Sequence, residues 1–221
     1  MSSGGKPKPA PPANRLRLRV TAVAEQHIRA GHPWVFSDSV KEQNRAGTAG
    51  ELAVIFDRND KFLAVGFFDP ESPIRVRILH VGKPLTIDAA FWQARLEAAL
   101  KRREGLFDER TTGYRLINGE SDGWPGLVLD RYDRTLVLKI YTAAWLDWLE
   151  TIEELLHACL PGQKIVFRCS RNIAAMAGSK TRFMNGTSRA GQSASCASSW
   201  ARTAPALRCR LTHAGSRKTP G

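Results

Sequence analysis

Two short segments in which arginine alternates with aliphatic residues constrain the fold of this chain most strongly. They read RLRLRV at residues 15–20 and IRVRILHV at residues 74–81. Because successive side chains of a β-strand point to opposite faces, this spacing predicts two half-buried strands with one apolar and one cationic face each. The sequence therefore favours a β-rich unit near the N-terminus with arginines on its outer surface.

The sequence between these two strands predicts a compact, mostly β domain over residues 15–84. GTAGELAVIFD and FLAVGFFD are apolar β-rich runs, and Arg58-Asn59-Asp60-Lys61 between them predicts a hairpin turn. One short helix is expected around Ala24–Arg29, with Gly31 placed to cap it and Pro33 preventing its continuation.

A second, α+β unit is predicted over residues 85–178. A helix is expected from Ile87 to Glu104, with Asp88 at its start, and its terminal Lys101-Arg102-Arg103 is interpreted as a solvated complement of the helix dipole. LVLDRYDRTLVLKIY predicts a hairpin, a helix follows at Trp145–Leu160, and KIVFRCS predicts another strand. The expected fold class is α+β: a small mostly-β barrel, a small α+β domain and a disordered basic tail.

The net charge of +12 is concentrated at the two ends of the chain. Residues 1–20 contain five basic and no acidic side chains, residues 181–221 contain seven basic and no acidic ones, and the middle is neutral. The overall charge therefore cannot by itself indicate nucleic-acid binding. Evidence for such binding has to come from local clusters of basic side chains. Residues 1–14 are rich in Gly, Ser, Pro and Lys and are expected to form a disordered arm without a secretory signal.

The composition changes after about Ser179. Residues 181–221 have almost no aliphatic side chains and no periodicity, so they cannot bury enough apolar area to offset their conformational entropy. We expect a disordered tail over residues 179–221, and two explanations stay open: out-of-frame translation of GC-rich DNA, or a natural basic RNA-binding tail.

The four cysteines form no C-x-x-C pair, and the histidines are not spaced around them as zinc ligands would be. Without a signal peptide they are expected to be reduced thiols, and no metal site is expected. No apolar run approaches the length of a membrane span, so a cytoplasmic protein is expected.

Two stretches carry a specific resemblance: GHPWVFS at residues 31–37 and RLINGESDGWPGLVLDRY at residues 115–132. In order and separation they are similar to motifs of class I S-adenosylmethionine-dependent ribosomal RNA methyltransferases that modify cytosine C5 in large-subunit RNA. The first resembles that family's PUA motif and the second its linking-domain motif. The resemblance covers about residues 15–178, and in the family a Rossmann-like methyltransferase domain follows.

The resemblance also implies which catalytic features to look for. The family uses an Asp-Pro-Pro motif and a cysteine nucleophile that attacks C6 of the base, whereas here Asp69-Pro70 is followed by Glu71. No Gly-rich turn for the cofactor follows residue 178. Cys196, in Ser-Ala-Ser-Cys-Ala-Ser-Ser, superficially resembles the family's cysteine context but has no apolar strand before it. We therefore expect a missing catalytic domain, no catalytic residue and no S-adenosylmethionine bound to this chain.

Aromatic and arginine side chains of the first domain are the candidate RNA-binding residues. Aromatic rings can stack on unpaired bases, and guanidinium groups can contact phosphates. The candidates are Arg15, Arg17, Arg19, Arg29, His32, Trp34, Phe36, Arg75 and Arg77.

Each of these candidates has a structural alternative. Trp34 and Phe36 could belong to the domain core, His32 could be a partly exposed turn residue, and the arginines could form a solvated face. If the strands at residues 15–20 and 74–81 are neighbours, their five guanidinium groups form one patch.

The loop of the second unit holds a further set of candidates. Glu120 and Asp122 could be mistaken for paired acid and base carboxylates, but a turn-forming Asp and a surface Glu fit their Gly- and Pro-rich surroundings better. On the resemblance alone, this loop would position substrate or dock the catalytic domain. The residues concerned are Arg115, Asn118, Glu120 and Asp122.

Three functional hypotheses remain. The chain is the N-terminal portion of a ribosomal RNA methyltransferase without its catalytic domain, a free-standing PUA-type RNA-binding module, or a fragment that is partly misfolded. The expected partner is ribosomal RNA, and neither DNA nor a membrane is expected.

Overall fold

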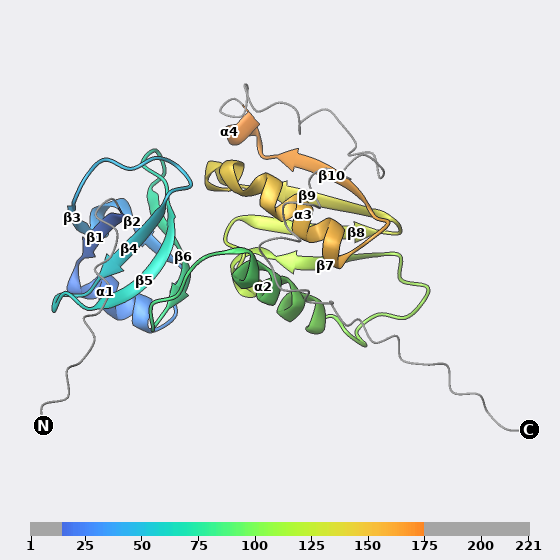
Figure 1. Cartoon of the computed structure of the whole chain (residues 1–221), viewed down its shortest axis with the longest axis horizontal. Coiled ribbons are helices and arrows are strands. Elements are labelled where there is room, and N and C mark those ends of the chain that lie inside the picture. The colour runs from blue at the N-terminus through green and yellow to red at the C-terminus, as the bar shows by residue number, and fades with distance from the viewer. Residues whose placement is uncertain (1–14, 175–221) are drawn as a thin grey trace, which may run out of the picture.

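The computed structural model describes residues 15–174, which form two packed units (Figure 1). The N-terminal unit is a six-stranded sheet in the order β2-β6-β5-β4-β1-β3, in which only β1 and β4 pair in parallel. Its elements are β1 (Leu16–Val20), α1 (Ala22–Arg29), β2 (Trp34–Phe36), η1 (Ser37–Ser39), β3 (Val40–Gln43), β4 (Leu52–Phe56), β5 (Phe62–Phe68) and β6 (Ile74–Val81).

The six-stranded sheet curls into a half-barrel around its own core. Leu16 and Leu18 of β1 meet Val76 of β6 and Phe68 of β5 there, all of them buried. The predicted alternation in β1 is therefore confirmed. The hairpin predicted between β4 and β5 is also present, with its turn residue Asp60 at a φ of 59°.

Helix α1 begins at Ala22, two residues before the predicted start, and ends at Arg29 as its sequence predicts. The hydroxyl of Thr21 accepts a hydrogen bond from the backbone N–H of Ala24, which caps the start. At the end, Gly31 adopts a φ of 90°, and the N–H groups of Gly31 and His32 donate to the carbonyls of Ile28 and His27. This pair of bonds is a Schellman motif, and it turns the chain sharply into β2.

The second unit is a four-stranded sheet in the order β10-β9-β8-β7 with α2 and α3 packed on one face (Figure 1). Strands β9 and β10 are parallel and the other pairs antiparallel. Its elements are α2 (Ala89–Lys101), β7 (Gly113–Asn118), η2 (Gly119–Asp122), β8 (Leu127–Tyr132), β9 (Thr135–Ile140), η3 (Ala143–Trp148), α3 (Leu149–Cys159), β10 (Lys164–Cys169) and α4 (Arg171–Ala174). The predicted α+β class is confirmed.

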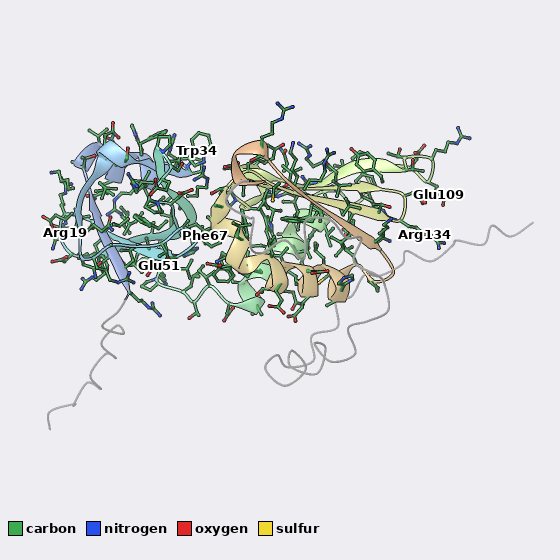
Figure 2. The ribbon with its side chains drawn as sticks, turned by 90° about the horizontal axis from the view of Figure 1, so that it is seen from above. Arg19, Trp34, Glu51, Phe67, Glu109 and Arg134 are labelled. Carbon is green, nitrogen blue, oxygen red and sulfur yellow. The ribbon has the colours of Figure 1, made fainter. Side chains whose placement is uncertain are left out.

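The two units share one hydrophobic core. Phe67 of β5 lies 4.8 Å from Trp145 and 6.0 Å from Trp92 between ring centroids. Because β5 packs against the half-barrel core on one face and against the second unit on the other, it reads as a continuous apolar run. Figure 2 shows Phe67 on the side of the N-terminal unit that faces the second unit.

The structure corrects two expectations about these elements. The segment predicted as one helix over Trp145–Leu160 begins as a 3₁₀ turn, and α3 starts only at Leu149. The Thr142 hydroxyl caps that turn, and the indole of Trp145 donates to the carbonyl of Pro125 at 2.8 Å, which holds the chain in the tighter turn. Strands β1 and β6 are not neighbours either, because β4 and β5 lie between them.

Several predicted features lie outside the described residues. These are the N-terminal arm at residues 1–14, the tail at residues 179–221 and Cys196. Within residues 15–174, no helix is long and apolar enough to cross a membrane.

Candidate nucleic-acid interface

Three rings from the GHPWVFS stretch form a triangle on the outside of the half-barrel; we call His32, Trp34 and Phe36 the aromatic row. Their ring centroids lie 6.0 to 6.4 Å apart, and the Trp34 ring meets both neighbours edge-on. His27 extends the row, with its ring 6.0 Å from His32. Phe36 is 42% exposed, which is unusual for so large an apolar side chain on a three-residue strand.

The register of β2 explains why the row faces outward. Val35 points into the half-barrel and is buried, so Trp34 and Phe36 on either side of it point away from that core. Neither ring belongs to either buried cluster. The interpretation of Trp34 and Phe36 as core residues is therefore wrong.

Trp34 lies at the edge of the contact between the two units. Across the sheet it pairs with Arg77, which pairs in turn with Phe67; Phe67 is buried, and Arg77 and Trp34 are half-buried. Its indole N–H donates to Glu120 Oε1 of η2 at 3.1 Å. Figure 2 shows Trp34 bordering the second unit and Arg19 on the far side of the N-terminal unit.

Arg77 is the arginine that stands beside the aromatic row. Burial lowers the pKa of Arg77, while the carboxylates of Asp69 and Glu120 oppose that effect. Its Nη1 donates a hydrogen bond to the carbonyl of Ile74 at 3.3 Å. A half-buried guanidinium with donors to spare is suited to a polar ligand.

The other candidate arginines are dispersed. Arg19 pairs with Asp60 at 2.6 Å, and Arg29 pairs with Glu25 and with Asp57 at 2.9 Å. Arg75 donates to the carbonyls of Asp69 and Pro70. Since β1 and β6 are separated, the condition for one five-arginine patch is not met.

Arg15, directly before β1, and Arg17, within it, differ from these arginines because both are exposed. The Arg17 guanidinium lies 4.4 Å from the Phe56 ring centroid. Among the described residues, neither Arg15 nor Arg17 forms a salt bridge.

Asp122 of the RLINGESDGWPG loop organises the second unit instead of facing solvent. Its side chain is 3% exposed and accepts from Arg103 at 2.6 Å and from Arg102 at 2.7 Å. It also accepts from the backbone N–H of Asn118 at 2.7 Å. From the sequence, Lys101-Arg102-Arg103 is interpreted as solvated. That interpretation is wrong for Arg103, whose side chain is 15% exposed and pairs with the buried Asp122.

The electrostatics of Asp122 follow from this geometry. Burial penalises its charged form, but the hydrogen bonds from Arg103, Asn118 and Arg102 outweigh that penalty and hold the pKa of Asp122 below its ordinary value. A carboxylate held ionised by three donors is a poor general acid or base near neutral pH. Asp122 is therefore a positioning residue for the loop.

The remaining loop candidates are brought together by this arrangement. Arg115 forms a bidentate pair with Asp130 at 2.8 and 3.2 Å and donates to Asn118 Oδ1 at 3.1 Å. Glu120 receives the Trp34 indole. Both loop residues, Asn118 and Glu120, then line one hollow with Trp34 and Arg77.

Tyr141, at the end of β9, also lines this hollow, and the sequence analysis missed it. It is 49% exposed, and Lys139 Nζ lies 4.6 Å from its ring centroid. A tyrosine directly after an alternating strand was the available signal, but the sequence could not show which face of the sheet is left uncovered.

The described residues offer no fit for S-adenosylmethionine. Such a cofactor needs a strand that leads into a Gly-rich turn and a helix, so that the backbone can approach it closely. In residues 15–174 the two parallel pairs are formed by β1 with β4 and by β9 with β10. These four strands are followed by Thr21, residues 57–61, residues 141–142 and Ser170, and none of these turns contains glycine. In the same residues no group of His, Cys, Asp or Glu could hold a metal.

Comparisons with known proteins identify a domain family and relatives of this chain. Residues 18–80 match a family described as PUA-like domain. A ribosomal RNA large subunit methyltransferase of Deinococcus radiodurans is 57% identical over 174 residues, which cover 76% of this chain and 43% of that protein. The ribosomal RNA large subunit methyltransferase I of Shewanella denitrificans is 36% identical over 155 residues, covering 69% of this chain and 39% of that protein.

Solved structures show the same fold. A putative SAM-dependent methyltransferase from Streptococcus mutans superposes with a TM-score of 0.58 at 17% identity, covering 68% of this chain and 40% of that one. The chain thus spans less than half the length of the relatives it matches. It carries a PUA-like domain and is, over about three quarters of its length, a homologue of ribosomal RNA large subunit methyltransferases.

Proposed function

We propose that this chain binds ribosomal RNA and provides the RNA-recognition portion of an S-adenosylmethionine-dependent methyltransferase that modifies cytosine C5 in large-subunit RNA. The observation that carries the proposal is the exposed aromatic row beside Arg77 in a PUA-like domain. The base specificity rests on the resemblance of the GHPWVFS and RLINGESDGWPG stretches. A protein acting on ribosomal RNA would work in the cytoplasm, where ribosomes are found.

The chemistry of the aromatic row favours unpaired RNA over duplex RNA. Stacking needs a free base face, which single strands, loops and bulges provide and a continuous A-form helix does not. Arg77 beside the row is half-buried, and Arg29 is paired with Asp57, so phosphate contacts supply a smaller share than in a basic groove. We therefore expect moderate salt dependence and a clear preference for single-stranded segments.

A free-standing RNA-binding module is the second candidate function. Residues 15–174 form two units with a shared core and a complete aromatic row, which is what a binding protein needs. Sequencing the genome beyond codon 180 separates the two candidates: an intact methyltransferase reading frame there favours the first, and its absence favours the second.

The direct test replaces Phe36 with Ala in the full-length chain. Phe36 contributes to neither buried cluster, so the variant should fold, and loss of one stacking ring should weaken binding to a single-stranded ribosomal RNA fragment by about 1 kcal/mol or more. Tyr132→Ala is the matched control, because Tyr132 is 56% exposed and lies on the second unit away from the row. Equal affinities of the Phe36 variant and the wild type would refute the role of the row.

A further inference from the structure

A hollow of about 490 Å³ lies where the two units meet. The N-terminal unit contributes Trp34, Ile74 and Arg77 to it, and the second unit contributes the η2 loop and Tyr141. Pockets for small molecules commonly have volumes of about 300 to 1,000 Å³. The hollow is therefore large enough for one ring-shaped ligand.

Two aromatic rings give the hollow its apolar surfaces. The Trp34 ring is half-buried, and its indole N–H is fixed on Glu120, so its orientation is set before any ligand arrives. Tyr141 is more exposed and lies beneath the ammonium group of Lys139. Rings held in this way offer stacking surfaces at a small cost in conformational entropy.

The polar groups of the hollow suit a neutral ring better than a bare anion. The charge of Arg77 is offset by Glu120 and Asp69, so no net positive charge attracts a free phosphate. Asn118 Nδ2 donates to Ser121 Oγ at 3.1 Å, and Ser121 Oγ donates to the Asn118 carbonyl at 2.6 Å. The second amide N–H of Asn118 and the remaining lone pairs of the two side chains are left for a ligand. Opposed donors and acceptors around an aromatic wall match the hydrogen-bonding edge of a nucleobase.

A glycine keeps the floor of the hollow open. Gly126 adopts a φ of 70°, and a Cβ built there would lie 2.9 Å from Thr142 Cγ2 and 3.7 Å from Arg77 Nε. A Cβ would therefore clash with the Thr142 methyl group and only reach van der Waals contact with Arg77, and the positive φ would add backbone strain.

The cations that phosphates need lie outside the hollow, on the face of the four-stranded sheet opposite α2 and α3. Val128 of β8 pairs with Lys139 of β9, and Lys139 pairs with Arg168 of β10, so these residues share one face. Arg168 is exposed and Lys139 half-buried. A strand whose base enters the hollow could continue along this face with its phosphates near both cations.

From this arrangement we propose that the hollow receives a single unpaired RNA base, stacked against Tyr141 and read by Asn118, Glu120 and Arg77. The proposal rests on the RNA-binding function above and adds a specific nucleotide subsite to it. The aromatic row would hold the neighbouring bases. Trp34 belongs to the row and also lines the hollow, so it would connect the row to the base subsite.

The test uses the full-length chain and a 12-nucleotide single-stranded RNA. Tyr141→Leu should weaken binding about tenfold through loss of stacking, while Tyr132→Leu, an exposed tyrosine outside the hollow, should leave the affinity unchanged. A second measurement follows the Trp34 indole N–H resonance, assigned with Trp34→Phe, during titration with cytidine, uridine, adenosine and guanosine 5′-monophosphates. The resonance should shift with at least one of them and stay unchanged with inorganic phosphate alone.

The outcomes separate this proposal from the RNA-binding proposal. If Phe36→Ala weakens RNA binding and Tyr141→Leu does not, the base subsite is refuted and RNA binding stands. If neither variant weakens binding, both proposals fail. An equal shift of the Trp34 resonance with phosphate and nucleotides would identify an anion site and overturn the base subsite.

Discussion

The aromatic row and the Asp122 loop are both rich in polar and aromatic residues, yet the fold uses them in opposite ways. Around Asp122, Arg103 and the Asn118 N–H satisfy the carboxylate in the interior. In the row, Phe36 is exposed, and the one side-chain hydrogen bond of Trp34 runs to the neighbouring unit. A motif whose carboxylate is satisfied internally stabilises the fold, whereas exposed rings remain available to a ligand.

Asp122→Asn should have the largest effect on stability. It removes one half of a buried ion pair and leaves Arg103, which is 15% exposed, without its charge partner. The expected loss in the free energy of unfolding is about 3 kcal/mol, measured by urea denaturation. Asp130→Asn is the control, because Asp130 is 21% exposed and pairs with an arginine that is 48% exposed. Equal losses in the two variants would contradict a special role for Asp122.

The second-largest effect on stability should come from replacing a glycine in the same loop. Gly123 has a φ of 76°, and a Cβ there would lie 1.5 Å from Arg95 Nη1, which donates to the Gly123 carbonyl at 2.8 Å. Gly162 has nearly the same φ, 74°, with nothing within 4 Å of its Cβ position. Gly162→Ala should therefore cost only the backbone strain, about 1 kcal/mol, and Gly123→Ala should cost clearly more in the same denaturation assay. Similar losses of stability in the two variants would show that the Arg95 side chain moves away from the new Cβ without a penalty.

The pH dependence of stability should show a smaller effect of the same loop. The pKa of Asp122 is lower in the folded chain than in the unfolded one, so its stabilisation is complete above the unfolded value, near pH 4. It is then lost as the pH falls through the folded value. Urea midpoints measured from pH 6 downward should fall more steeply below pH 4 for the wild type than for Asp122→Asn. Parallel curves would show that Asp122 is not ionised preferentially in the fold.

The smallest effect should come from the link between the two regions. Trp34→Phe keeps a ring at the edge of the hollow but removes the hydrogen bond to Glu120, which is only half-buried. The free energy of unfolding should decrease by about 1 kcal/mol, without a change in the denaturation slope. A split into two transitions would instead show that this single bond keeps the units together.

Local patterns in the sequence predicted most of the elements but not their long-range partners. The alternation in β1, the turn at Asp60 and the Asp88 cap of α2 depend on neighbours within a few residues. The order of the strands depends on contacts between segments that are far apart in sequence. The sequence therefore allowed β1 and β6 to be neighbours, whereas in the structure they are separated.

The same limit applies to the candidate sites. Arg103 and Asp122 are 19 residues apart in sequence, and no helical or strand period connects them. Strand β2 has only three residues, too few for periodicity to decide whether Trp34 faces the core or the second unit. Residue types therefore indicated both regions, and only tertiary packing could separate a ligand surface from an internal ion pair.

Photochemical crosslinking of the full-length chain to a single-stranded ribosomal RNA fragment tests RNA binding by the aromatic row most directly. Trypsin would release residues 30–41 as one peptide that contains the whole row. We predict that this peptide carries the strongest crosslink and that excess unlabelled single-stranded RNA suppresses it more effectively than duplex RNA. Crosslinks confined to other peptides, with none in residues 30–41, would contradict the assignment of the row as the RNA-binding surface.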